Sequence, residues 1–257
     1  MKNWNSFPHD ASAWEYDADT LLELWPDLHR GDCEPVPDSE DLLEAWAAFH
    51  AGDFGRAVAL AESIGIAAHA VMTKSSGIYA SYLEEDSQRE IECFQAAIAT
   101  AEEAIETYPD DPNAYYFHAF NLGRYSQSIS VVKAIKQGFA AKIRSSLENA
   151  LELRPDHAEA HTAMGLYHAE IIDKIGKMIG SMTYGASENE AIKHLEKAIE
   201  LTPDSPIAHI EYANGLYLLY EDRRLDEVSD LYVRAAEMTP RDAMEKLDVE
   251  FAKSELE

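Results

Sequence analysis

The sequence predicts an all-α fold built as a stack of helix-turn-helix repeats, and two observations carry that prediction. Only 12 Gly and 10 Pro occur among 257 residues, while Ala, Leu, Glu and Ile recur in long stretches. Such a composition favours helices over a turn-rich β architecture. In addition, four segments end alike, which indicates internal repeats: AEEAIETYPDDPNAYY, LENALELRPDHAEAHT, LEKAIELTPDSPIAHI and VRAAEMTPRDAMEKLD.

Each repeat contains an apolar stripe at helical spacing, a Pro that ends one helix, and Ala-rich sequence that opens the next. In the repeat that ends at Pro203, small residues stand where two helices must approach closely, at Gly165, Ala191 and Ala198. This arrangement resembles the tetratricopeptide repeat (TPR) family. The resemblance implies a right-handed superhelix of helix pairs with a concave groove.

Two of the repeats are unusually long. Their closing prolines, at positions 109, 155, 203 and 240, are 46, 48 and 37 residues apart, against about 34 in an ordinary repeat of this type. The additional residues fall between the two helices of a repeat, at about 125–138 and 172–187. Insertions within repeats usually project on one face of the stack, which is often the binding face.

The chain divides into four parts. Residues 1–37 form an acidic, Trp-rich arm, 38–90 form divergent helical hairpins, 91–240 form the TPR-like repeats, and 241–257 form a capping helix with outward charges. All four tryptophans lie in the first 46 residues, at Trp4, Trp14, Trp25 and Trp46. The arm either folds back over the first helix pair or the groove, or serves as a docking segment for a partner.

A more specific resemblance covers Ile91 to Pro240. The order PDDPNAYYFHAFNLGRYSQSISVVKAIKQGF, LENALELRPDHAEAHTAMGLYHAEI and KMIGSMTYGASENEAIKHLEKAIELTPDSP resembles the helical domain of the regulator of microtubule dynamics proteins and their bacterial relatives. The paired insertions, Gly185, and the step from Leu122 to Gln127 are its most specific marks. The resemblance implies a scaffold whose groove accepts a protein segment or a hydrophobic ligand, and it implies no catalytic residues.

The charge of the chain excludes several classes of partner. Lys and Arg number 21 against 48 Asp and Glu, for a net charge of -27, which opposes nonspecific attraction to nucleic acid or anionic lipid. Cys33 and Cys93 form no metal-binding or disulfide pattern. The longest uncharged apolar stretch, residues 63–73, is too short to span a bilayer, and the start has no signal-like segment. We therefore expect a cytoplasmic, acidic protein without a membrane span.

One region departs from this acidity, because residues 112–147 contain no Asp or Glu. Its basic residues are Arg124, Lys133, Lys136, Lys142 and Arg144, and a shorter acid-free stretch in the second insertion contains Lys174 and Lys177. The region is either a cationic, apolar-lined site for an acidic peptide, a carboxylate or a fatty-acid-like ligand, or a basic surface that pairs with neighbouring acidic helices.

TPR geometry also predicts which residues line the concave wall. These candidates are Asn113, Tyr116, Phe120 and Arg124 in one helix, Thr162 and Leu166 in the next, and Ile210, Asn214 and Tyr217 in the last. Tyr and Phe are good binding anchors because they bury a large area at a small entropic cost. The alternative is that Tyr116 and Phe120 pack against an insertion.

No motif in the chain predicts catalysis, a metal site or a cofactor. His157, His161 and His168 share one helix, but their spacing is not that of an H-E-x-x-H zinc site, and we expect them to pack between repeats. A nucleophile elbow and a phosphate-binding loop are both missing. The sequence thus predicts a non-catalytic scaffold or adaptor that binds a protein or peptide segment in a concave groove. The alternative is a carrier of a small hydrophobic or anionic ligand held between the two insertions.

Overall fold

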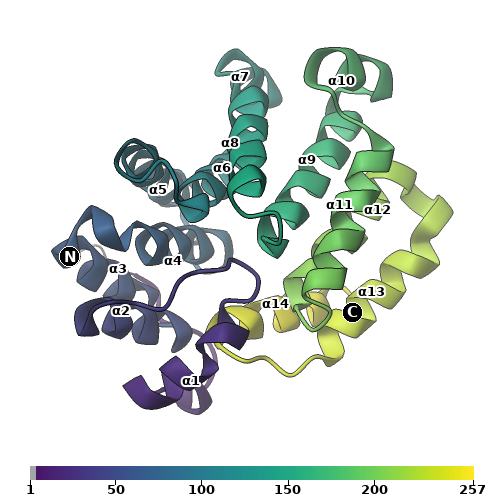
Figure 1. The fold of residues 1–257 in the computed structure, drawn as a ribbon. Helices are drawn as coiled ribbons and strands as arrows, with labels where there is room; N and C mark the ends of the chain where they lie inside the picture. The colour runs from purple at the N-terminus through teal and green to yellow at the C-terminus, as the bar shows by residue number, and fades with distance from the viewer. Residues whose placement is uncertain (1–3) are drawn as a thin grey trace.

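Over residues 4–257, which the computed structural model describes, the chain forms helices and connecting loops without a β-strand. Figure 1 shows pairs of antiparallel helices stacked side by side into an arc. The pairs are α2 (Glu40–His50) with α3 (Phe54–Ile64), α4 (His69–Tyr82) with α5 (Ser87–Thr107), α6 (Pro112–Gln127) with α8 (Phe139–Leu153), α9 (Ala158–Ile175) with α11 (Glu188–Leu201), and α12 (Pro206–Tyr220) with α13 (Leu225–Glu237). The predicted all-α repeat fold is confirmed.

Proline and side-chain caps set the helix ends. Pro112 and Pro206 occupy the first turns of α6 and α12, where a missing N–H costs nothing. The carboxylate of Asp111 accepts a hydrogen bond from the backbone N–H of Asn113 at 2.8 Å and thereby caps α6. At α9 the cap is His157, whose ring nitrogen accepts from the N–H of Ala160. The turn after each closing Pro is therefore tight.

Small residues let the paired helices approach closely. Ala150, Ala198 and Ala235 in the second helices of three repeats are fully buried. A Cβ atom on Gly165 of α9 would stand 2.6 Å from a side-chain carbon of Leu195 in α11, which is inside van der Waals contact. Glycine at this position is thus a packing requirement of the repeat.

Each predicted insertion contains a short helix. These are α7 (Val131–Lys136), between α6 and α8, and α10 (Lys177–Tyr184), between α9 and α11. Figure 1 shows α7 and α10 projecting at the same end of the molecule. Gly185 ends α10 with φ +64°, and a Cβ atom there would collide with the guanidinium of Arg144. That guanidinium donates to the Tyr184 carbonyl at 2.7 Å and so ties α8 to the end of α10.

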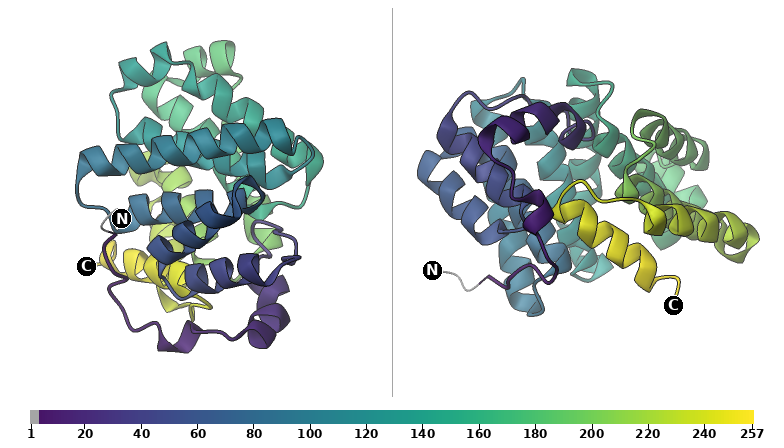
Figure 2. Two further views of the ribbon diagram at one scale, coloured as in Figure 1. Left: turned by 90° about the vertical axis from the view of Figure 1, so that its left-hand side faces the viewer. Right: turned by 90° about the horizontal axis from the view of Figure 1, so that it is seen from below.

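Residues 4–37 lie along the body of the repeats (Figure 2) and include α1 (Ala18–Leu28) and the 3-10 turn Ser12–Trp14. The Trp4 ring packs on Tyr79 with centroids 4.2 Å apart. At the other end of the arc, the hydroxyl of Tyr16 donates to the carbonyl of Arg241 at 2.6 Å. The arm therefore connects the first helix pairs to the last.

The C-terminal helix α14 (Ala243–Ser254) packs against α12 and α13 and also reaches α2. Two of its acidic residues, Glu245 and Asp248, are buried, whereas the sequence predicted a capping helix with outward charges. Asp248 accepts a hydrogen bond from the Tyr82 hydroxyl of α4 at 2.5 Å. These acids face inwards because α14 lies on the concave side, between the first and last repeats. Short 3-10 turns at Ile66–Ala68 and Glu221–Arg224 complete the described helices.

Candidate functional site

An apolar pocket of about 190 Å³ lies on the concave side of the arc. The first helices of the repeats, α4, α6, α9 and α12, supply most of its wall, and α7, α8, α10 and α14 supply the rest. Its largest apolar side chains are Ile78, Phe117, Phe120, Phe139, Ile143, Leu166 and Ile171. Val131 and Ile135 of α7, with Ile175 and Tyr184 beside α10, line the outer end, so the pocket lies between the two insertions.

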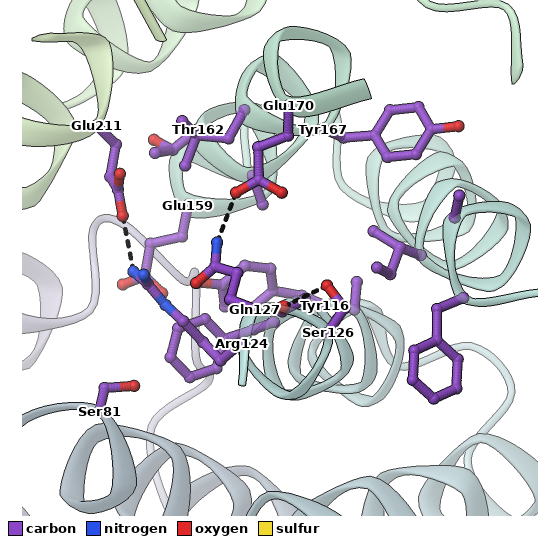
Figure 3. Close-up of a pocket in the computed structure, with 18 of the residues that line it drawn as sticks. Ser81, Tyr116, Arg124, Ser126, Gln127, Glu159, Thr162, Tyr167, Glu170 and Glu211 are labelled. Atoms are coloured by element: carbon purple, nitrogen blue, oxygen red, sulfur yellow. Dashed lines mark hydrogen bonds and ion pairs between the residues drawn. The ribbon is translucent and has the colours of Figure 1, made fainter. Parts of the chain in front are cut away.

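Three predicted residues of α6 line the pocket with one helical face. Tyr116, Phe120 and Arg124 are four residues apart, a spacing that places them above one another. The Arg124 guanidinium lies over the Phe120 ring at 5.8 Å. It also donates to the Glu211 carboxylate of α12 at 2.7 Å, and Figure 3 shows this bond. Burial lowers the pKa of Arg124, but the Glu211 carboxylate outweighs burial and holds this pKa above its ordinary value. The guanidinium is thus charged and already paired.

The facing wall comes from α9 and repeats the same spacing. Glu159, Thr162, Leu166 and Glu170 all line the pocket. The Gln127 amide donates to Glu170 at 2.5 Å across the gap between α6 and α9 (Figure 3). Lys174 bonds to the same carboxylate at 2.9 Å. Apart from these paired groups, this wall is apolar.

At the inner end of the pocket, a buried lysine joins the arm to two repeats. The Lys74 ammonium of α4 bonds to Asp32 of the arm at 2.6 Å and to Glu159 of α9 at 3.1 Å. Burial lowers the pKa of Lys74, but these carboxylates outweigh burial and raise the pKa. Burial likewise raises the pKa of Asp32, whereas the Lys74 ammonium holds it well below its ordinary range. Lys74 and Asp32 therefore stay ionised, whereas burial, together with the nearby Asp32 charge, raises the pKa of Glu159.

Two histidines extend this set of contacts to the C-terminal helix. His29 bonds to Asp32 at 3.0 Å and to His50 at 3.2 Å, and His50 bonds to Asp242, which caps α14, at 2.8 Å. Burial lowers the pKa of His29 to about 4, against the opposing effect of Asp32. We call Asp32, His29, His50, Lys74, Glu159 and Asp242 the polar seam. Its groups partner one another, so their role is to fasten the arm, α2, α4, α9 and α14 together.

Among the predicted basic residues, only Arg124 and Lys174 line the pocket. Lys133 lies over the Tyr125 ring at 5.8 Å, and Lys136 is exposed on α7. The other three are in ion pairs on the outer surface: Lys142 with Glu102, Arg144 with Glu148, and Lys177 with Glu188. The predicted cationic residues are therefore dispersed over the surface and do not converge in the pocket.

Four predicted concave-wall residues lie outside the pocket. Asn113 is 1 % exposed and bonds to His157, and Ile210 is equally buried in the core against α13 and α14. Asn214 bonds to Glu211, and Tyr217 lies on the open surface. Asn113 is held by the arm, because its amide donates to the Glu34 carboxylate at 2.5 Å, and Ile210 is covered by α14, which packs on α12.

Several pocket residues escaped the sequence analysis. They come from α4, α8 and α14 and include Ile78, Tyr82, Phe139, Ile143 and Asp248. Helix α4 is buried on nearly all sides, so no amphipathic stripe distinguishes its pocket face. Phe139 and Ile143, in contrast, follow the first insertion directly at helical spacing, and this pattern was a usable signal.

The histidines of α9 are used in packing contacts. His157 caps its own helix and bonds to Asn113, and His161 bonds to His194 of α11 at 2.8 Å. Within residues 4–257 no cluster of three His, Cys, Asp or Glu side chains has a metal-binding arrangement. In the same range no helix combines the length and apolarity that a membrane crossing requires.

Comparison with known sequences identifies the family of this chain. The sequence model described as regulator of microtubule dynamics protein 1-3 matches residues 66–244, which is more than half of the chain. The chain belongs to this family. The match includes both insertions, the pocket helices from α4 to α12, and the start of α14. No curated protein sequence matches the chain significantly.

Comparison with solved structures identifies similar folds. The crystal structure of TTC0263, a thermophilic TPR protein of Thermus thermophilus, is 19% identical, covers 84% of this chain and 98% of its own, and has a TM-score of 0.58. A monomeric mutant of IFIT1 with Gppp-AAAA is 18% identical and covers 93% of this chain and 59% of its own, at a TM-score of 0.45. The first likeness confirms the TPR-like helical repeat fold predicted from the sequence.

Proposed function

We propose that this family member is a non-catalytic carrier that holds the apolar part of a small ligand in the pocket between α7 and α10. The observation that carries the proposal is an apolar cavity of about 190 Å³ whose three cations are already bonded to carboxylates: Arg124 to Glu211, Lys174 to Glu170, and Lys74 to Asp32 and Glu159. An apolar cavity of about 150 Å³ is large enough for benzene. The pocket therefore suits one alkyl chain or ring, and an uncharged ligand suits it better than an anion.

Binding of a neutral fluorescent dye such as Nile red tests the pocket directly. Ala163→Phe puts a ring into the cavity from the α9 wall, where Ala163 is half-buried. Ala141→Phe is the matched control, because Ala141 is exposed on α8. We expect the control to bind the dye as the wild type does and Ala163→Phe to lose at least about tenfold in affinity. Equal binding by both variants would rule out the pocket as the site.

Native mass spectrometry of the purified chain tests the carrier role itself. We expect a bound small molecule that organic extraction removes, and we expect Ala163→Phe to lack it. A wild-type chain that is free of ligand and has no affinity for a series of alkyl alcohols would overturn the proposal.

A second candidate function is the binding of a protein segment, which is typical of TPR-like domains. Helix α14 supports it, because this helix of the same chain lies on the concave side and shows that the face packs a helix. Selection from a random peptide library distinguishes the two functions. A protein-binding groove would enrich related peptides on the wild type and lose them on Ala163→Phe, whereas a small-ligand carrier would enrich none.

A further inference from the structure

Exposed apolar side chains are concentrated on the two short helices α7 and α10. Their exposed side chains are Val131, Val132, Ile135, Met178, Ile179 and Met182, which we call the tip surface. Exposure reaches 74 % for Met178 and 83 % for Met182. Both helices project at the same end of the molecule (Figure 1), so the six exposed side chains belong to that end. Large apolar patches of this kind mark interaction sites.

Basic residues accompany these side chains, and acidic residues are missing from the same segments. Residues 112–147 and 174–187 contain no Asp or Glu, in a chain of net charge -27. Lys133 and Lys136 on α7 form no ion pair with any residue of the described range 4–257, whereas Lys174 and Lys177 do. The tip surface therefore combines exposed aliphatic groups with uncompensated positive charge.

We propose that the tip surface docks the molecule on an anionic lipid bilayer. Short helices with apolar side chains on one face and lysines beside them lie at the boundary between headgroups and acyl chains. The composition favours a bilayer over a protein partner, because the six side chains include no Tyr, Trp or Arg and because lysine, which stands beside them on α7, is depleted at protein interfaces. The lysines meet the negative headgroups.

The overall charge of -27 does not prevent this contact, because electrostatic interactions are local in salt. At about 0.1 M salt the screening length is about 10 Å, so the acidic helices further from the bilayer contribute little. Two of the acidic residues that flank α10 in the chain, Glu170 and Glu188, are paired with Lys174 and Lys177, which leaves the exposed Asp173 as the flanking acid outside these pairs. The acidic body in fact favours one orientation, with the tips towards the membrane and the rest away from it.

Docking would place the outer end of the pocket against the bilayer. Val131 and Ile135 belong both to the tip surface and to the pocket wall. The proposal is nevertheless independent of the carrier function, since it concerns side chains that are exposed whether or not the pocket is filled. Ala163→Phe, which fills the pocket, should dock as the wild type does, so failure of one proposal leaves the other testable.

Vesicle flotation of the full chain tests the proposal. The wild type should float with vesicles that contain phosphatidylcholine and phosphatidylserine, bind phosphatidylcholine alone weakly, and dissociate as salt rises. Lys133→Glu/Lys136→Glu and Val132→Ser/Met182→Ser should each lower binding at least about tenfold. The matched controls are Lys193→Glu on α11 and Val36→Ser/Leu225→Ser, which change exposed residues away from the tips and should bind normally.

Three outcomes would overturn the proposal. The first is that the wild type floats with neither type of vesicle at low salt. Another is equal flotation by the tip variants and the controls. The third is a wild type that self-associates, or binds acidic peptides, in the absence of lipid and loses that association in Val132→Ser/Met182→Ser. In that case the tip surface is a protein interface.

Discussion

The two ends of the pocket differ in the surroundings of their charged side chains, which are buried and paired at the inner end and exposed at the outer end. At the inner end, the polar seam holds the Lys74 ammonium in the interior, where it donates to both the Asp32 and the Glu159 carboxylates. At the outer end, Lys133 and Lys136 stand on α7 beside exposed Val132. Buried groups that satisfy one another stabilise a fold, whereas exposed apolar groups beside uncompensated charge have no role in the fold of a monomer. We therefore infer that the inner end stabilises the fold and that the outer end contacts other molecules.

Replacement of the seam lysine should have the largest effect. Lys74→Met keeps much of the apolar stem but leaves the buried Asp32 without its ammonium partner. Removing one member of a buried pair costs about 3–5 kcal/mol, and we expect that loss in urea unfolding. The control, Lys133→Met on α7, should change the free energy of unfolding by less than about 0.5 kcal/mol. A loss below about 1 kcal/mol for Lys74→Met would show that the seam does not fasten the fold.

Acid should also lower the free energy of unfolding. Burial lowers the pKa of His29 and of His157 from 6.5 to about 4. The unfolded chain therefore binds protons below pH 6.5 that the folded chain excludes, so stability falls as pH drops from about 7 towards 4. The lowered pKa of Asp32 causes no loss of stability in this range. The stability that Asp32 contributes is lost only when the pH falls below 3.8, the pKa of this carboxyl in the unfolded chain. His194 acts in the same direction, whereas Asp248, with its pKa raised to about 8, and Glu34, with a raised pKa, bind protons in the folded chain and offset part of the loss. Between pH 7 and 5 we therefore expect urea unfolding to show a net loss of about 1–2 kcal/mol.

A tip variant is the control for this pH dependence. Val132→Ser/Met182→Ser should lose the same free energy between pH 7 and 5, because its substitutions are remote from the buried histidines. The Asp248→Asn variant removes one of the opposing acids, and a stability that stays flat over this range in that variant would contradict the assignment of neutral, buried imidazoles at His29 and His157.

A pair of glycines tests how firmly the outer end is held. Gly185 and Gly138 have similar positive φ angles, +64° and +67°, but only at Gly185 would a Cβ atom meet another group, the Arg144 guanidinium. Gly138→Ala should cost about 1 kcal/mol for the left-handed backbone alone. Gly185→Ala should cost about 1–2 kcal/mol more, since it also breaks the bond from Arg144 to the Tyr184 carbonyl. Equal losses in thermal unfolding would mean that α10 is not held by Arg144.

How far the sequence predicts this molecule depends on the range of the interactions involved. Local signals, such as the repeated prolines and the Ala and Gly positions, predict the helix pairs and both insertions correctly. The pocket face of α6 also follows from its spacing. In contrast, Arg124 and Glu211 are 87 positions apart in the chain, and no local pattern links them. The sequence likewise contains no signal that α14 folds into the concave space and covers Ile210.

Substitutions in the tip surface should have the smallest effect on stability. They therefore test most directly whether the two ends of the pocket have different roles. Val132 and Met182 are 63 % and 83 % exposed, so their replacement by Ser removes little buried area, and the free energy of unfolding should change by less than about 0.5 kcal/mol. The same variant should lose vesicle binding. A stability loss above about 1 kcal/mol would instead show that these side chains pack within the fold, and the two ends of the pocket would then differ in polarity but not in role.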